Sequence, residues 1–111
     1  MTYQQGDIVF VNFPFDDTAV AKPRPALIAG KSRSRIGAYI IAKITSATRT
    51  DDGSFWLTND MLSRPTQRSS QVRTNEIQTL SENHILHKFS TLNRATLRVV
   101  CEKIQQNFTV E

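Results

Sequence analysis

The sequence predicts an α+β fold: a small, partly open β-barrel of five or more short strands, followed by a C-terminal amphipathic helix. Runs of β-branched and aromatic residues separated by polar turns fill the first two thirds of the chain, whereas helical periodicity is concentrated at its end. A small sheet with many turns tends to curl, which hides its edge strands. The length of 111 residues supports one domain, residues 1–111, with a modest core.

Five runs are expected to form strands. Residues 8–13 are dense in β-branched and aromatic side chains and end at Pro14, and residues 38–45 form the longest candidate. The remaining candidates are residues 26–29, 55–57 and 77–80. Glycine marks two of the turns, a basic hairpin tip over residues 31–37 and a turn over residues 51–53.

Two helices are expected near the end of the chain. Ser81 is a candidate N-cap for a short helix over residues 82–86, and Asn93 is a candidate N-cap for a longer one. The apolar residues of the longer helix recur at i, i+3, i+4, i+7 and i+11, which places them on one face. They are Leu97, Val100, Cys101, Ile104 and Phe108.

The composition is that of an ordinary globular protein, because 39% hydrophobic and 22% charged residues argue against disorder. No apolar run approaches the roughly 20 residues that span a bilayer. The N-terminus lacks the basic start and apolar stretch of a secretory signal. One cysteine, Cys101, excludes an internal disulfide and a cysteine-rich zinc site. We therefore expect a cytoplasmic protein that does not associate with membranes.

Positive charge gathers in the middle of the chain. Between Lys22 and Arg73 the sequence has ten Lys or Arg residues and three Asp residues. Such a span could neutralise the phosphates of a nucleic acid. A solvated basic surface without a specific partner explains the charge equally well.

Several catalytic and cofactor-binding motifs are missing from the sequence, among them glycine-rich nucleotide loops, the HExxH zinc motif and the Gly-x-Ser-x-Gly elbow. His84 and His87 lie three residues apart in the expected short helix and could bind a metal ion. A partly exposed histidine pair is favoured, because no cysteine is near and Glu76 and Glu82 do not fit the spacing of ligands. We expect neither a metal ion nor another cofactor.

Arg24 stands between Pro23 and Pro25, just before a predicted buried strand. The prolines stiffen the backbone, which lowers the entropy lost when the planar guanidinium binds a phosphate. On composition alone, an ion pair with Asp16 or Asp17 at the strand entrance is favoured. Thr45 and Ser46 end the longest strand candidate, where hydroxyls can either donate to a phosphate oxygen or stabilise a turn.

Motifs along almost the whole chain, from Gly6 to Ile104, resemble the MazF/PemK family of toxins. They are the opening Gly-Asp-Ile-Val strand that ends in an aromatic residue and proline (6–15), Arg-Pro-Ala-Leu-Ile (24–28) and Ile-Thr-Ser (44–46). Later stretches also match, namely Ser-Gln-Val-Arg (70–73) and Ile-Gln-Thr-Leu (77–80). Their order and spacing together are fairly specific. The resemblance implies a small SH3-like barrel.

The resemblance also implies a function. Family members cleave single-stranded RNA at selected sequences without metal, leaving 2′,3′-cyclic phosphate and 5′-hydroxyl ends. They act as homodimers that a cognate antitoxin protein inactivates. Carried over residue by residue, the resemblance makes Arg24 and Thr45 the catalytic pair. Arg24 would stabilise the phosphorane, and Thr45 would donate to a nonbridging oxygen with Ser46 as a weaker helper.

Two positions depart from the family pattern. Part of the family uses an Arg-x-Asp segment near the site, and here the matching residues are Arg73, Thr74 and Asn75. The resemblance therefore makes Arg73 and Asn75 possible helpers of the catalytic pair. Asn75 cannot take a proton as a carboxylate can, so either Asp16 or Asp17 supplies the base or catalysis relies on Arg24 and Thr45. Ser90 replaces a common glycine, and this change is expected to affect the turn before the last helix rather than the chemistry.

RNA would bind in a groove formed by residues 15–21 and the loop after Thr45. Lys22, Arg49, Arg64 and Arg68 are expected to contact the RNA, mainly through backbone phosphates. Phe15 or Trp56 could stack on a base, worth about 1–3 kcal/mol. For Trp56, packing in the core is the favoured interpretation.

Two other functions remain open. A toxin of the same fold could bind and poison DNA gyrase, as CcdB toxins do through a C-terminal helix and a final Trp-Gly-Ile. This sequence has no tryptophan after Trp56, which counts against that function. A noncatalytic RNA-binding relic would explain Asn75 and Ser90.

Overall fold

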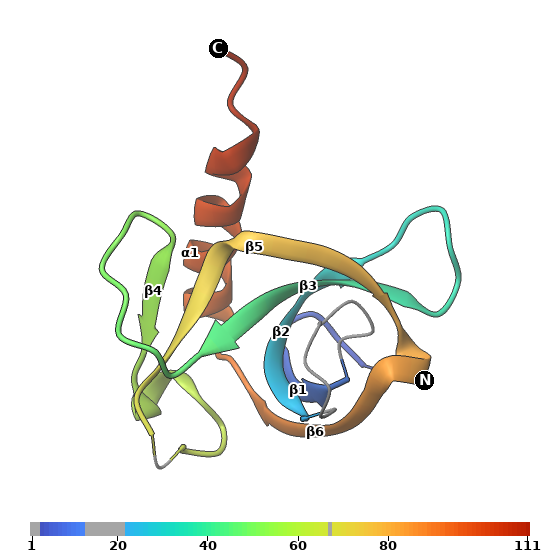
Figure 1. Cartoon of the computed structure of the whole chain (residues 1–111), viewed down its shortest axis with the longest axis horizontal. Helices are drawn as coiled ribbons and strands as arrows, with labels where there is room; N and C mark the ends of the chain where they lie inside the picture. The colour runs from blue at the N-terminus through green and yellow to red at the C-terminus, as the bar shows by residue number, and fades with distance from the viewer. Residues whose placement is uncertain (1–2, 13–21, 67) are drawn as a thin grey trace.

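Six antiparallel strands form one sheet in the part of the chain that the computed structural model describes, residues 3–12, 22–66 and 68–111 (Figure 1). The strand order is β4-β5-β3-β2-β1-β6. The strands are β1 (Asp7–Val11), β2 (Arg24–Lys31), β3 (Ala38–Thr45), β4 (Ser54–Leu57), β5 (Ser70–Ser81) and β6 (Ile85–Thr91). The helix α1 (Arg94–Gln105) follows, and short 3₁₀ turns are η1 (Asn59–Met61), η2 (Glu82–His84) and η3 (Gln106–Phe108).

The sheet curls without closing completely (Figure 1). β4 and β6 are its outer strands, so each has one edge outside the main ladder. Beyond these strands, Leu62 and Leu92 form an isolated antiparallel bridge, and Ser63 N donates to Thr91 O at 2.9 Å. The predicted α+β fold, a partly open barrel of five or more strands with a C-terminal helix, is confirmed.

Alternate residues of the strands build two hydrophobic cores on opposite faces of the sheet. Neighbours such as Ile8 and Val9 belong to different cores, because successive side chains of a strand point to opposite faces. The core beside α1 contains Ile8, Leu27, Ala42, Ile44, Val72, Leu92, Leu97, Val100 and Ile104. The other contains Val9, Val11, Ala26, Ile28, Tyr39, Ile41, Leu80 and Ile85.

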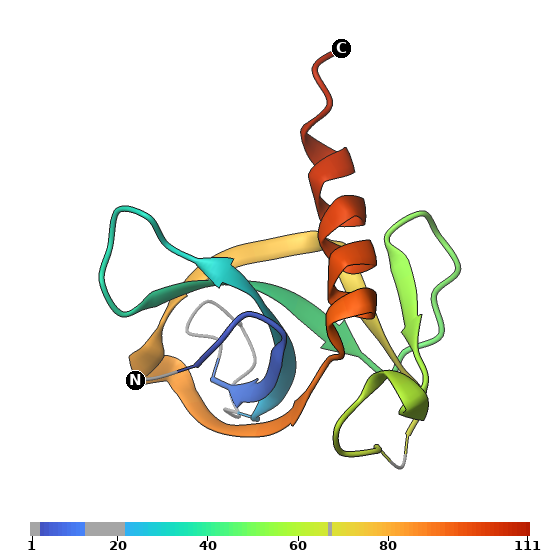
Figure 2. The ribbon, with the colours of Figure 1, turned by 180° about the vertical axis from the view of Figure 1, so that it is seen from behind.

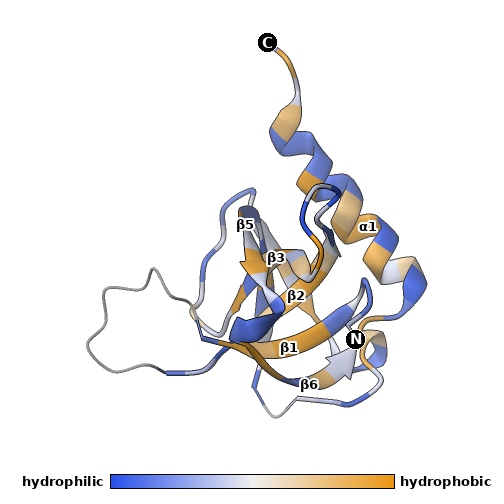
Figure 3. Ribbon diagram, turned by 90° about the vertical axis from the view of Figure 1, so that its right-hand side faces the viewer, coloured by the Kyte–Doolittle hydropathy of each residue, from blue (hydrophilic) through white to orange (hydrophobic). Residues whose placement is uncertain are grey.

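The helix α1 lies against one side of the curled sheet (Figure 2) and alternates hydrophobic with hydrophilic residues along its length (Figure 3). Asn93 caps it as predicted, because its side chain accepts a hydrogen bond from Thr96 N at 2.8 Å. Leu97, Val100 and Ile104 are buried, as expected. The prediction for Phe108 was wrong: α1 ends at Gln105, the chain tightens into η3, and Phe108 turns out to solvent with 70% of its surface exposed.

The strand predictions differ from the structure mostly in length. The strand predicted over residues 38–45 matches β3, whereas β2 and β5 extend well beyond residues 26–29 and 77–80. Polar residues in these extensions, including Arg24 and Gln71, interrupt the apolar pattern from which the strands were predicted. β2 therefore begins at Arg24 itself.

The helix predicted over residues 82–86 is absent, and β6 takes part of its place. Ser81 does cap a turn, accepting from Asn83 N at 3.3 Å, but the turn is the three-residue η2. The chain then pairs with β1, in a register that sets Ile85 opposite Val11. This pairing satisfies the outer edge of β1 and buries Ile85, which a surface helix would not do. His87 lies on β6 beside the ring of Phe10 instead of facing His84 along a helix.

Gly6 joins three parts of the fold. Its N–H donates to Ile28 O at 2.8 Å, and its carbonyl accepts from Leu92 N at 2.9 Å. Its φ of 97° lies in the region that glycine tolerates best. A Cβ at this position would lie 3.2 Å from Leu97 Cδ2. Glycine therefore allows α1 to pack directly beside the start of β1.

Within the described residues, no helix has the length and apolarity needed to cross a membrane.

Two adjacent valines of α1 test the packing of the helix. Val100 is fully buried, whereas Val99 is 43% exposed. We expect Val100→Ala to lower the free energy of unfolding by about 2 kcal/mol, because two buried methyl groups and their contacts are lost. Val99→Ala is the matched control and should change it by less than about 0.5 kcal/mol. Urea unfolding measures both, and equal effects would contradict this packing.

Candidate active site

Two adjoining hollows meet where β2 begins and β3 ends. They share Arg24, Pro25, Ile44 and Thr45. The larger has a volume of about 560 Å³ and the smaller about 260 Å³. The larger is also lined by Ile8, Phe10, Pro23, Ser46, Leu57, Arg64, Pro65, Thr66, Arg68, Ser70 and Phe89, and the smaller by Lys43, Arg49, Arg73 and Glu76.

The register of β2 and β3 brings Arg24 and Thr45 together. Ala26 lies opposite Lys43 in this antiparallel pair. Two residues back along β2 and two residues forward along β3 lead to Arg24 and Thr45. The two side chains predicted as the catalytic pair are thus placed at the same end of neighbouring strands, and both line both hollows.

Thr45 is half-buried, and its Oγ1 accepts a hydrogen bond from Ala47 N at 3.1 Å. This is the turn-stabilising contact that the sequence suggested. It uses an acceptor site of the hydroxyl and leaves the hydroxyl hydrogen able to donate to a ligand. Ser46, which follows, is exposed and lines the larger hollow. Phe15, Asp16 and Asp17, also named as candidates, lie outside the described residues.

Arg73 is buried behind the smaller hollow and is held by four hydrogen bonds. Its Nε donates to Glu76 Oε2 and its Nη2 to Asp51 Oδ2, both at 2.9 Å. Its Nη1 donates to Ser54 Oγ at 2.9 Å and to Gln71 Oε1 at 2.8 Å. With only 4% of its side chain exposed, Arg73 fixes its neighbours rather than offering its charge to a ligand. The hydrogen bond that Arg73 donates to Asp51, and then the one that it donates to Glu76, hold the pKa of Arg73 above its ordinary value.

Gln71 extends this network to the loop after Thr45. It is fully buried, and its Nε2 donates to the carbonyls of Ala47 and Arg49 at 3.2 and 3.1 Å. Its Oε1 accepts from Arg73. A buried amide that is bonded at both ends resists displacement, because an unpaired polar group would be costly there. The loop that follows the candidate catalytic threonine is therefore tied to β5.

A bulge in β5 places Glu76 in the smaller hollow. Ile77 pairs with Ala42 and Val72 with Ile44, so residues 73–76 lie opposite Lys43 alone. The extra residues bend the strand so that Arg73 and Glu76 form an ion pair. Arg49 Nη1 also contacts Glu76 Oε2, at 3.3 Å. Glu76 was not among the predicted site residues, because its spacing of three from Arg73 indicates a contact only once the bulge is known.

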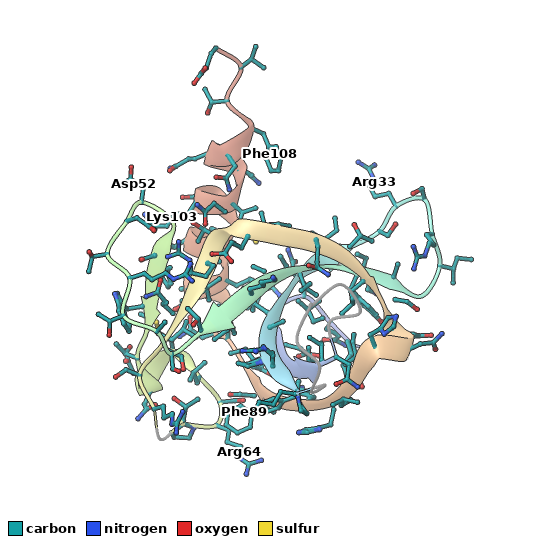
Figure 4. All side chains as sticks on the ribbon, viewed as in Figure 1. Arg33, Asp52, Arg64, Phe89, Lys103 and Phe108 are labelled. Carbon is teal, nitrogen blue, oxygen red and sulfur yellow. The ribbon has the colours of Figure 1, made fainter. Side chains whose placement is uncertain are left out.

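Asn75 does not lie in either hollow, so the prediction that it helps Arg24 and Thr45 is not supported by its position. It lines a separate depression with Asp52 and Lys103, two residues that lie near each other in Figure 4. The Asn75 side chain occupies the space where a Cβ of Gly53 would be. The bulge turns Asn75 to this side of β5 and Glu76 to the other.

The cationic residues predicted to bind RNA divide between the two hollows. Arg64 and Arg68 line the larger and Arg49 the smaller, whereas the exposed Lys22 lines neither. Trp56 was favoured as a core residue, and this interpretation was wrong: it lies on the edge strand β4 and is 38% exposed. Phe55 and Leu57, its neighbours in sequence, pack against the core beside α1. Successive side chains of a strand point to opposite faces, so Trp56 points away from that core.

Ser90 lies within β6 rather than in a turn, so the expectation for this position was also wrong. It is 2% exposed, and its Oγ bonds both backbone groups of Arg64, accepting from N at 3.0 Å and donating to O at 2.9 Å. The Arg64 guanidinium carbon lies 5.0 Å from the centre of the Phe89 ring (Figure 4). Ser90 thereby shapes one wall of the larger hollow.

Residues 3–12, 22–66 and 68–111 contain no group of three or more His, Cys, Asp or Glu side chains placed to hold a metal ion. His84 and His87 in particular lie on different elements. The absence of a metal from the reaction stays a prediction.

Comparisons with known proteins concern the family and the fold of this chain. A family model described as PemK-like, MazF-like toxin of type II toxin-antitoxin system matches residues 4–108. A comparison with curated protein sequences found no match.

Solved structures are similar in fold. They include a mycobacterial endoribonuclease in complex with its cognate antitoxin (TM-score 0.73, 13% identity, covering 99% of this chain and 98% of that one). The Mycobacterium tuberculosis toxin MazF-mt6 has a TM-score of 0.71 and 18% identity, covering 95% and 98%. MazF from Deinococcus radiodurans has a TM-score of 0.73 and 16% identity, covering 97% of each chain. At such identities the likeness shows the fold alone.

The ion pair between Arg73 and Asp51 predicts a pH-dependent stability. The Arg73 hydrogen bond holds the pKa of Asp51 below its ordinary value of 3.8. A depressed folded-state pKa stabilises the folded protein above the unfolded-state pKa, and this stabilisation is lost as the pH falls through the folded-state value. We expect Asp51→Asn to be less stable than the wild type at pH 7, and the difference to shrink as the pH falls below about 4 and to vanish only below the folded-state pKa of Asp51. Urea unfolding at several pH values measures this, with Asp52→Asn in the same turn as control. Parallel curves for the wild type and Asp51→Asn would contradict it.

Proposed function

We propose that this chain, which belongs to the family of PemK-like and MazF-like toxins of type II toxin-antitoxin systems, is a sequence-selective endoribonuclease. It cleaves single-stranded RNA without a metal ion and leaves 2′,3′-cyclic phosphate and 5′-hydroxyl ends. The observation that carries the proposal is the convergence of Arg24, Thr45 and Glu76 on one hollow. A cation, a hydroxyl and a carboxylate there match what RNA cleavage by its own 2′-hydroxyl needs.

The reaction requires stabilisation of the pentavalent phosphorane, a base for the 2′-hydroxyl and a proton for the 5′ oxygen. Arg24 offers its planar guanidinium to the equatorial oxygens, and the Thr45 hydroxyl donates to one of them. Ser46 is a secondary donor on the side of the larger hollow. Arg24 is exposed, so water reaches this point and can protonate the 5′ oxygen.

Glu76 is the carboxylate that the Arg73-Thr74-Asn75 segment lacks, and we assign it as the acceptor of the 2′-hydroxyl proton. Arg73 holds it at the edge of the hollow through a buried guanidinium. Its second partner, Arg49, is 51% exposed, and an ion pair of this kind is worth about 1 kcal/mol or less. An RNA phosphate can therefore draw Arg49 away, which uncovers one side of the Glu76 carboxylate while Arg73 keeps it in position.

Two partners complete the proposal. The fold is shared with a mycobacterial endoribonuclease solved in complex with its cognate antitoxin, which supports control of this chain by an antitoxin protein. A homodimer in the cytoplasm is the state in which we expect the chain to act.

The first test is cleavage itself. Incubation with a long single-stranded RNA in EDTA should give discrete fragments that end in cyclic phosphates. Arg24→Ala should lower kcat/KM by about 10²-fold or more, the loss expected when one preorganised donor to the transition state is removed. Arg33→Ala, on the exposed hairpin between β2 and β3, is the control and should cut as the wild type does (Figure 4).

Other outcomes of this assay point to the alternatives. Tight RNA binding without turnover would support a noncatalytic relic. Intact RNA together with retention of DNA gyrase on a column of the protein would support a gyrase poison.

The second test separates chemistry from scaffolding at Glu76. Glu76→Gln keeps the shape of the side chain but cannot accept a proton, so cleavage should fall by about 10²- to 10⁴-fold. In the wild type, kcat/KM should decline toward low pH because the base becomes protonated. In Glu76→Gln this decline should be absent. Asp51→Asn also removes a carboxylate from Arg73, yet Asp51 does not line either hollow, and its effect should stay within about tenfold. Equal losses in the two variants would assign Glu76 a purely structural role.

A further inference from the structure

Part of the wall of the larger hollow is apolar, and binding and cleavage of a phosphate do not need an apolar wall. Ile8, Phe10, Leu57 and Phe89 give it an apolar lining beside Arg24 and Thr45. The rings of Phe10 and Phe89 meet edge to face, with centroids 5.8 Å apart. An apolar, partly aromatic wall next to a phosphate-binding pair is where an unstacked nucleobase of single-stranded RNA can lie. The volume of about 560 Å³ accommodates one base.

Arg64 is placed over this apolar surface. Its guanidinium carbon lies 5.0 Å from the centre of the Phe89 ring, and Figure 4 shows the two side chains together at the edge of the barrel. Such a contact holds the planar guanidinium in one orientation. An arginine that is already oriented loses less entropy when it binds a ligand than a free surface arginine does.

The backbone of Arg64 is held as firmly as its side chain. Leu62 bridges to Leu92, and Ser63 exchanges hydrogen bonds with Thr91, its N donating at 2.9 Å and its Oγ accepting at 3.0 Å. The next step of this ladder sets Arg64 beside Ser90, whose buried hydroxyl bonds both the N–H and the carbonyl of Arg64. Pro65 follows and further restricts the conformation of Arg64.

We infer that the larger hollow binds one base of the RNA and that Arg64, positioned by Ser90 and Phe89, selects guanine there. This inference rests on the proposed function, because it takes single-stranded RNA as the ligand. A guanidinium donates two parallel hydrogen bonds to the adjacent acceptors O6 and N7 of guanine. Adenine presents a donor beside N7 and uracil has no two adjacent acceptors, so each would leave part of the fork unpaired. Cytosine presents O2 and N3 side by side, but it is a single ring, and the larger guanine covers more of the apolar wall.

The test is selection of bound sequences from a random single-stranded RNA pool carrying 2′-fluoro riboses, which lack the nucleophile and cannot be cut. The wild type should enrich guanine at one position. Arg64→Lys keeps the positive charge but not the fork, so it should reduce the guanine preference at that position about tenfold or more while leaving other positions unchanged. Arg33→Lys is the matched control and should select the same sequences as the wild type.

Ser90→Ala tests the positioning role. Without the hydroxyl, the guanine preference should weaken at the same position, whereas Ser90→Thr, which keeps the hydroxyl, should preserve more of it. If Arg64 only contacted a phosphate, its removal would weaken binding to every RNA sequence and lower the salt dependence of the affinity. Arg64→Lys, which keeps the charge, would then resemble the wild type.

The result that overturns the inference is distinct from failure of the proposed function. No enriched guanine with the wild type, or an unchanged preference in Arg64→Lys, removes Arg64 as a base-reading residue even if the protein cuts RNA. Conversely, a guanine preference that depends on Arg64 supports the inference even if cleavage is not observed. Thermal unfolding of each variant confirms that folded proteins are compared.

Discussion

The guanidinium of Arg73 makes the contacts on which the geometry of the candidate active site depends. One buried group bonds Asp51 and Ser54 near the start of β4, Gln71 within β5 and Glu76 at the end of the bulge. Gln71 passes this constraint on to Ala47 and Arg49 in the loop after β3. A charge taken out of water in this way is tolerated only when its donors are satisfied, and that requirement holds three segments in one arrangement.

A second constraint acts on the opposite side of Thr45. The sheet stays open between β4 and β6, and residues 62–64 cover this gap by running beside residues 90–92. The last step of that ladder is made by the Ser90 side chain instead of by backbone. The contacts between residues 62–64 and 90–92, which nearly close the barrel, therefore also hold Arg64 beside the apolar hollow.

The two constraints produce unlike surfaces on either side of the same strand ends. The smaller hollow gathers charge, with Arg24, Lys43, Arg49 and Glu76, whereas the larger one is mainly apolar with arginines at its wall. RNA has the same division, since its phosphates are charged and its bases are flat and largely apolar on their faces. Under the proposed function, the phosphate to be cut would lie at Arg24 and Thr45, which line both hollows, and one base would lie in the larger hollow.

Local patterns in the sequence were sufficient for β3, the cap and buried face of α1, and the placement of Arg24 and Thr45 at strand ends, because strand alternation and helix caps depend on near neighbours. Only the tertiary structure determined that β6 pairs with β1 and that the bulge in β5 places Glu76, instead of Asn75, in the smaller hollow. It also determined that Arg73 is buried and that Ser90 bonds the backbone of Arg64. Each of these depends on a partner distant in sequence. A strand edge or a buried charge finds hydrogen-bond partners far away in sequence, and these come close only when the chain has folded.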